Sequence, residues 1–138
     1  MADTRTVLQQ GIELWNAHDR QRWVGLFDDD ADLEAPGGIR VRGRSGAELF
    51  FDTWHEAFPD NSIADAVVFG AGEQGVEEAQ FAGTHTGVLR TPNGDIPPTG
   101  RNVASRYAAV CHVRADKVTS FHMYFDVAEV LAQLGLMS

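Results

Sequence analysis

The sequence has few cysteines, few basic residues and no long apolar run, and each shortage excludes a class of protein. A single cysteine, Cys111, rules out an intramolecular disulfide. Since 11 basic residues stand against 20 acidic ones and form no patch, binding to a nucleic-acid backbone is disfavoured. No run of about 18 apolar residues occurs, and the N-terminus lacks a basic segment followed by an apolar one. We therefore expect a cytoplasmic protein that binds no nucleic acid and enters no membrane.

Motifs that bind cofactors and metals are also missing. The chain has no glycine-rich phosphate loop, dinucleotide fingerprint, nucleophile elbow or cysteine pair. Its 5 histidines form no pair at helical i, i+4 or short-loop spacing. The acidic run 28–30 lacks the glycine and glutamate of a calcium loop, so we interpret it as a solvated turn. We expect no cofactor and no metal.

A helical period dominates the first part of the chain. Apolar residues recur at three- and four-residue steps over 4–16, which predicts an amphipathic helix. Asp19 is a suitable N-cap for a second, short helix. A short strand is expected over 31–36. Ser45 and Glu48 then have the spacing of a capping box, which predicts the start of a third helix.

From Ser62 onward the apolar period is two, which predicts strands. The expected strands span 63–69, 76–89, 103–113 and 118–126, and a last helix spans 127–134. The segment 91–100 contains three prolines and two glycines, so a loop is expected there. Helices followed by strands are typical of an α+β domain, here a single one over 1–138, whose antiparallel sheet curls over the helices.

The expected strand 103–113 has two apolar faces. One face includes Tyr107 and Cys111, and the other includes Ala108 and Val110. Both faces are therefore expected to be buried against another element or another chain. Because the helices can cover only the concave face, we expect the convex face to meet a second copy of the chain in a homodimer.

The last strand carries the largest group of side chains that could act in catalysis. Side chains alternate along a strand, so His122, Tyr124 and Asp126 share one face. In a central strand of a curled sheet that face is expected to line a cavity. Burial there favours the protonated carboxyl group and suits Asp126 to acid/base catalysis. The alternative is that Asp126 only caps the helix that follows it.

A histidine and several aromatic residues complete the candidate site. His85 shares a strand face with Ala79 and Phe81 and is a second candidate catalyst, the alternative being a structural histidine of the core. Aromatic side chains on facing elements are expected to border an apolar slot of about 300 Å³ or more, unless they simply form the core. The expected substrate-binding residues are Trp15, Trp54, Phe58, Tyr107 and Tyr124.

Four motifs follow one another along the chain. They are Trp54-His55-Glu56-Ala57-Phe58-Pro59-Asp60, Gly83-Thr84-His85-Thr86-Gly87, Ile96-Pro97-Pro98-Thr99-Gly100, and Tyr124-Phe125-Asp126 followed by Gln133-Leu134-Gly135-Leu136. In this order they resemble the SnoaL-like polyketide (ester) cyclases of the nuclear transport factor 2-like superfamily. The resemblance implies an α+β cone-shaped barrel, in which N-terminal helices close a strongly curved antiparallel sheet, and commonly a dimer through the outer face of the sheet. It also implies an acid/base aspartate on the last strand, which Asp126 matches.

Residues and resemblance together favour a cofactor-independent acid/base enzyme that acts on a small apolar carbonyl compound. Asp126 would remove a proton next to the carbonyl group, while His85, His122 or a tyrosine donates a hydrogen bond to the enolate. Proton abstraction of this kind serves aldol cyclisation, isomerisation and dehydration alike, and the same pocket could also serve hydrolysis. Two functions without catalysis also fit the sequence, namely a module that binds a small molecule and an interaction domain that uses the open sheet face.

Overall fold

Helices and strands follow each other in the order expected of an α+β protein in the structure, a computed structural model that describes residues 2–137. The described elements are α1 Thr4–Asn16, α2 Arg20–Val24, β1 Phe27–Ala35, β2 Ile39–Arg42, α3 Gly43–Ala57, β3 Ser62–Ala71, β4 Gln74–Thr84, β5 Leu89–Thr91, β6 Gly94–Ile96, β7 Asn102–Arg114, β8 Lys117–Phe125 and α4 Val127–Gln133. Among the described helices, none combines the length and apolar character needed to span a membrane.

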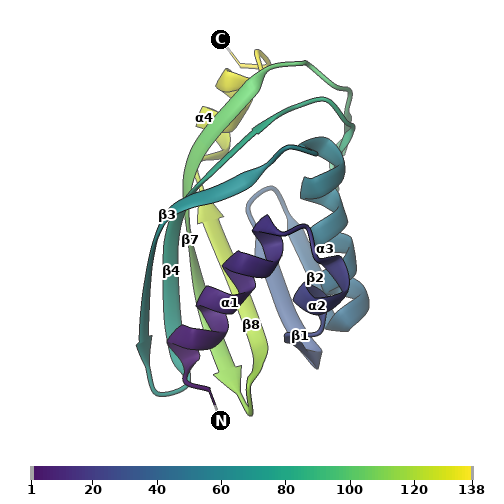
Figure 1. Ribbon diagram of the computed structural model, residues 1–138. Coiled ribbons are helices and arrows are strands. Elements are labelled where there is room, and N and C mark those ends of the chain that lie inside the picture. The colour runs from purple at the N-terminus through teal and green to yellow at the C-terminus, as the bar shows by residue number, and fades with distance from the viewer. Residues whose placement is uncertain (1, 138) are drawn as a thin grey trace.

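Six strands form a curved sheet in the order β2-β1-β8-β7-β4-β3 (Figure 1). All neighbours in this sheet are antiparallel except β1 and β8, which run parallel. The α+β class and the strongly curved, mostly antiparallel sheet are confirmed. The sheet does not close into a barrel, because β2 and β3 lie at its two opposite edges.

Helix α1 crosses the concave face of the sheet, where it packs on β3 and β4 (Figure 1). Its bounds are those of the predicted helix. The helix begins at Thr4 because Asp3 caps it and accepts a hydrogen bond from the Thr6 N–H at 2.8 Å. Glycine makes the close approach possible. A Cβ at Gly75 would lie 2.7 Å from Cδ1 of Leu8 and 2.8 Å from Cγ2 of Thr4, so a larger residue there would displace these side chains of the helix.

Helix α3 begins three residues earlier than the position predicted from an N-cap at Ser45, and its capping box is not formed. Arg42 is the N-cap and makes no side-chain capping bond. Strand β2 leads directly into the helix through Gly43, whose φ of 73° and close approach to the carbonyl oxygen of Asp29 both favour glycine. The turn is thus made by the backbone, and Ser45 with Glu48 lies inside the helix instead of starting it.

Besides the predicted strand 76–89, which ends at Thr84 as β4, two other segments differ from the sequence prediction. The acidic run 28–30 is part of β1, which begins at Phe27 because Phe27 pairs with Val118 of β8 and the register then shifts before Asp32. The segment 91–100 is not only a loop, since β5 and β6 form a small two-stranded sheet. Pairing with partners distant in sequence, or across a short turn, overrides the local composition in both places.

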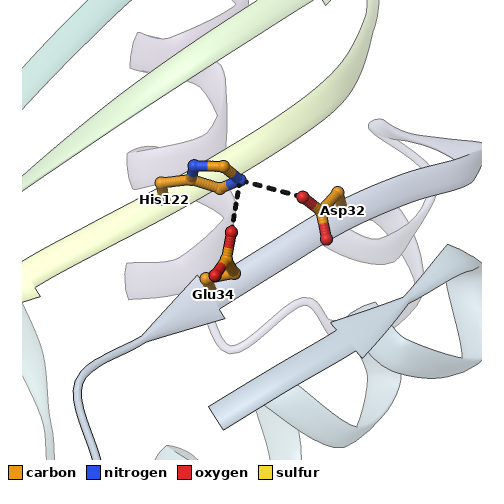
Figure 2. A group of neighbouring side chains, drawn as sticks. All are labelled: Asp32, Glu34 and His122. Carbon is orange, nitrogen blue, oxygen red and sulfur yellow. Dashed lines mark hydrogen bonds and ion pairs between the residues drawn. The ribbon is translucent and has the colours of Figure 1, made fainter. Parts of the chain in front are cut away.

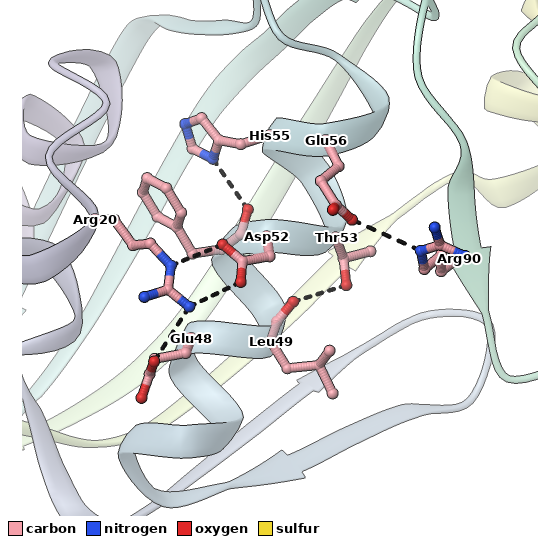
Figure 3. A network of polar contacts seen from close by, with 9 residues as sticks. Arg20, Glu48, Leu49, Asp52, Thr53, His55, Glu56 and Arg90 are labelled. Carbon is pink, nitrogen blue, oxygen red and sulfur yellow. Dashed lines mark hydrogen bonds and ion pairs between the residues drawn. The ribbon is translucent and has the colours of Figure 1, made fainter.

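The outer side of α3 is tied to its neighbours by charged groups (Figure 3). The Arg20 guanidinium of α2 donates two hydrogen bonds to the Asp52 carboxylate, each 2.8 Å long, and also pairs with Glu48. One helical turn further, Glu56 forms an ion pair with Arg90 of β5. These exposed pairs add little to stability, but they fix which elements lie beside α3.

The convex face of the sheet carries a row of apolar side chains. Pairing between strands places Phe69, Val76 and Val110 side by side on this face. Phe69 is 64% exposed and Val110 is 47% exposed, which is unusual for large apolar residues in a single row.

We predict that two copies of the chain pair through this row. Phe69→Glu should then convert a dimer to a particle of the 15.1 kDa chain mass, because a charge would be buried in the contact. Leu49→Glu is the matched control, since Leu49 is similarly exposed but lies on α3. Light scattering at micromolar concentration measures both, and a wild-type chain that is already monomeric contradicts the prediction.

Candidate active site

An apolar cavity lies between the helices and the concave face of the sheet. Its volume is about 80 Å³, which is room for roughly five water molecules or one compact organic molecule. The predicted slot of about 300 Å³ is thus larger than the cavity that forms. Four of the five predicted substrate-binding residues line it, namely Trp15, Trp54, Phe58 and Tyr107.

Strand β8 turns the opposite face to the cavity from the one we expected. Phe121, Met123 and Phe125 line the cavity, whereas Tyr124 is 59% exposed on the convex face. The prediction that Tyr124, His122 and Asp126 border the cavity is therefore wrong. Burying three large apolar side chains outweighs burying a histidine and a tyrosine, so the apolar set faces inward.

Asp126 lies beyond the end of β8, as the N-cap of α4. Its Oδ1 accepts a hydrogen bond from the Glu129 N–H at 3.1 Å, and the side chain is exposed. This is the arrangement expected if the aspartate serves as a helix cap.

His85 is fully buried against Phe58 but is not among the residues that line the cavity. Its Nδ1 accepts a hydrogen bond from the Thr99 N–H at 3.2 Å, so the proton of the neutral ring is on Nε2. Burial lowers the pKa of His85 and keeps the ring neutral. The geometry favours the alternative of a core histidine, although its buried Nε2 has no hydrogen-bond partner within residues 2–137.

A carboxyl group that sequence reasoning missed points into the cavity. Glu77 of β4 lines the cavity and is only 5% exposed. The phenolic O–H of Tyr107, on the neighbouring strand β7, donates a hydrogen bond of 2.6 Å to its Oε2. Burial raises the pKa of Glu77 to about 7, against a smaller lowering by the bond from Tyr107. Near neutral pH the group therefore exists in both protonation states.

The groups around Glu77 keep their protons. Burial, with the charge of Glu77 as the second cause, raises the pKa of Tyr107 well above its ordinary range. The same two causes raise the pKa of the buried thiol of Cys111. Tyr107 is thus a hydrogen-bond donor to the carboxyl group, and Cys111 is an unreactive thiol.

One more polar group lies among the residues of the cavity wall. The indole N–H of Trp54 is buried, and no group in residues 2–137 accepts a hydrogen bond from it. An unpaired buried donor is costly unless a ligand or water pairs with it. It is therefore a candidate donor to an oxygen atom in the cavity.

The sequence did contain a signal for Glu77. It alternates with Ala79 and Phe81, the apolar residues that we used to infer an inward face for His85. The same alternation places Glu77 on that face. A carboxylate at an inward strand position is rare, so this alternation is the signal that identifies Glu77.

Comparison with known proteins agrees with this architecture. The family model described as SnoaL-like polyketide cyclase matches residues 5–134. The chain belongs to the SnoaL-like polyketide cyclase family. No curated protein matches the sequence significantly.

Solved structures of the same fold are distant in sequence from this SnoaL-like chain. A candidate polyketide cyclase from Xanthomonas campestris pv. campestris is 21% identical, with 94% of each chain covered and a TM-score of 0.82. A candidate polyketide cyclase from Pseudomonas putida KT2440 is 17% identical, with 96% of this chain and 98% of that chain covered and a TM-score of 0.85. A protein with a ketosteroid isomerase-like fold from Catenulispora acidiphila, in complex with trimethylamine, is 20% identical, with coverages of 94% and 92% and a TM-score of 0.78.

The raised pKa of Glu77 predicts a pH-dependent stability. Between pH 4.5, the ordinary pKa, and about 7, the pKa in the fold, the unfolded chain loses this proton while the folded chain keeps it. The free energy of unfolding should therefore fall by ~3 kcal/mol as the pH rises through this window. Glu77→Gln should remove that fall, and Glu78→Gln, on the exposed side of the same strand, should retain it. Urea unfolding at several pH values measures the difference, and parallel curves for wild type and Glu77→Gln contradict it.

The cap at Asp126 predicts a graded effect on stability. Asp126→Ala should lower the free energy of unfolding by about 1 kcal/mol, because the Glu129 N–H loses its acceptor, while Asp126→Asn should change it little. Thermal unfolding distinguishes the two variants. Equal losses in both would mean that the charge of the aspartate, and not its capping bond, is what matters.

Proposed function

We propose that this SnoaL-like chain is a cofactor-independent acid/base enzyme that removes a proton next to the carbonyl group of a small apolar compound. The observation that carries the proposal is the Glu77 carboxyl group, buried in an apolar cavity with a pKa of about 7. A group with this pKa can take up and return a proton at neutral pH, which an ordinary carboxylate does poorly.

Tyr107 and Glu77 have different roles in this mechanism: Tyr107 orients the carboxyl group, and Glu77 accepts the proton. The phenol holds Oε2, and no other hydrogen bond to the carboxyl group comes from residues 2–137, so Oε1 can face a substrate. The carboxylate takes the proton from the carbon next to the carbonyl group. The electron pair of the broken C–H bond moves toward the carbonyl oxygen and gives an enolate.

The enolate needs a donor, and Trp54 supplies one. Its buried, unpaired N–H can donate to the oxygen atom on which negative charge develops. The enolate carbon then attacks a second carbonyl carbon of the same molecule, which forms a ring, or takes a proton back at another position, which isomerises the substrate. Protonated Glu77 returns its proton in either case.

The cavity limits the size of the substrate. A volume of about 80 Å³ holds a compact molecule, whereas ligand sites for larger molecules usually exceed about 300 Å³. Two of the similar structures are candidate polyketide cyclases. A cyclisation substrate of polycyclic size would enter this chain only if α1 or the aromatic side chains moved outward.

A binding module without catalysis is the second candidate function. Asp126, the residue that matches the acid/base aspartate implied by the family resemblance, forms a helix cap instead of facing the cavity. In such a module, Trp54 and Tyr107 would hold a ligand and Glu77 would only orient it.

Deuterium exchange at the carbon next to a carbonyl group separates the two functions. Cyclopentanone is a suitable probe, because it is apolar and compact and has exchangeable protons beside its carbonyl group. An acid/base enzyme should accelerate its exchange with D₂O at pH 7 above the buffer rate. Glu77→Gln should lower that acceleration by about 10²-fold, and Glu78→Gln should leave it unchanged.

Two results would contradict the enzyme. Exchange no faster than in buffer, together with cyclopentanone-induced NMR shifts of the Trp54 indole signal, supports the binding module. Acceleration that Glu77→Gln leaves intact assigns the proton transfer to another residue.

A further inference from the structure

Three metal-ligating side chains meet on the convex face of the sheet, away from the cavity (Figure 2). Asp32 and Glu34 lie two residues apart on β1, and both point outward. His122 of β8 is the register partner of Glu34 across the parallel pair. All three side chains are half-buried, so the sheet orients them while one direction stays open to solvent.

The three groups converge on one point. Nε2 of His122 lies 3.0 Å from Oδ2 of Asp32 and 3.0 Å from Oε2 of Glu34. A metal ion with bonds of about 2.1 Å to a nitrogen and an oxygen at the right angle of octahedral coordination sets those two atoms about 3.0 Å apart, whereas a tetrahedral angle sets them about 3.4 Å apart. Without an ion, the single N–H that Nε2 can carry makes a hydrogen bond to only one of the two carboxylates, that of Asp32.

The surroundings also fit a metal site. Arg40 of β2 contacts the other oxygen of Glu34, Oε1, at 3.0 Å, which leaves Oε2 directed at His122. Ligating carboxylates are commonly held in this way by an outer hydrogen bond. Within residues 2–137, Asp32 has no ion pair apart from that with His122. Two carboxylates and one arginine leave a local charge that favours a divalent cation.

We propose that Asp32, Glu34 and His122 bind a divalent transition-metal ion of the zinc class. One imidazole and two carboxylates suit Zn²⁺, Co²⁺ or Ni²⁺ better than Mg²⁺ or Ca²⁺, which prefer oxygen ligands alone. Water completes the coordination on the open side. The site lies on the opposite face from Glu77, so the ion has a structural role, which is to join β1 to β8.

The ion would strengthen an irregularly paired part of the sheet. The β1 and β8 strands form the one parallel pair in the six-stranded sheet, and the register between Phe27 and Asp32 is irregular. Asp32 and Glu34 follow that irregular stretch directly. A metal bound there would hold the N-terminal third of the chain to the last strand. This departs from the sequence-based expectation of no metal, which considered only ligands close together in the sequence.

Thermal unfolding of tag-free protein, treated with EDTA and dialysed, tests the proposal. At pH 7.5, a hundredfold excess of Zn²⁺ over its dissociation constant should raise the Tm by about 5 °C or more, whereas the same concentration of Mg²⁺ should not. Co²⁺ should develop d–d absorption bands in the visible range on binding. His122→Gln should lose the Zn²⁺ shift and the Co²⁺ bands.

His112→Gln is the matched control. His112 lies on the same face, on the adjacent strand β7, and its Nε2 contacts Gln74 instead of a carboxylate. This variant should keep the full Tm shift, and Asp32→Asn provides a second ligand variant in case His122→Gln unfolds. An unchanged Tm of the wild type with Zn²⁺ overturns the proposal. So does a Tm shift that survives in both ligand variants, since the ion would then bind elsewhere.

Discussion

The helices have one place to bury their aromatic side chains, and it is the concave face of the sheet. Trp15, Phe50 and Trp54 project from α1 and α3 toward that face, and strands β4, β7 and β8 meet them with apolar residues. Hydrophobic burial of this size dominates the folding energy of a small domain. Any polar residue at an inward strand position is consequently removed from water. The unusual state of Glu77 follows from this constraint, and not from a special local motif.

Periodicity in the sequence predicts much of this fold because it reports burial directly. Residues 4–16 form the helix that their spacing predicts, and β7 and β8 differ from the predicted strands by about one residue at each end. The prediction of element boundaries failed at two places where backbone conformation or strand pairing, and not the pattern of side chains, determines the structure. Gly43 starts α3 through a positive φ, and β1 is extended to Phe27 by pairing with a strand about ninety residues away. Neither feature has a local signature.

The candidate site was harder to predict, for a different reason. The alternation of side chains along β8 divides its residues into two sets, but it does not say which set faces the cavity. The set with His122 and Tyr124 offers more reactive groups, but Phe121 and Phe125 bury more apolar area, and it is the apolar set that faces inward. Counting apolar area first would have identified the inward face of β8 and, by the same rule, Glu77 on β4. The meeting of His122 with Asp32 lay beyond this reasoning, because 90 positions separate them and only the sheet topology joins them.

The missing side chain at Gly75 has a consequence for how such a pocket can change size. Helix α1 packs directly on the strand at this glycine, and a Cβ there would contact the side chains of Leu8 and Thr4. The glycine therefore allows a closer approach of helix and sheet than a larger residue would. A side chain at this position would displace the Leu8 and Thr4 side chains of α1 and so change the space beneath the helix, at some cost in packing. The capacity of the pocket is thus set partly by the contact of Gly75, which does not line the pocket, with Leu8, which does, and it can vary while Glu77, Tyr107 and Trp54 stay the same.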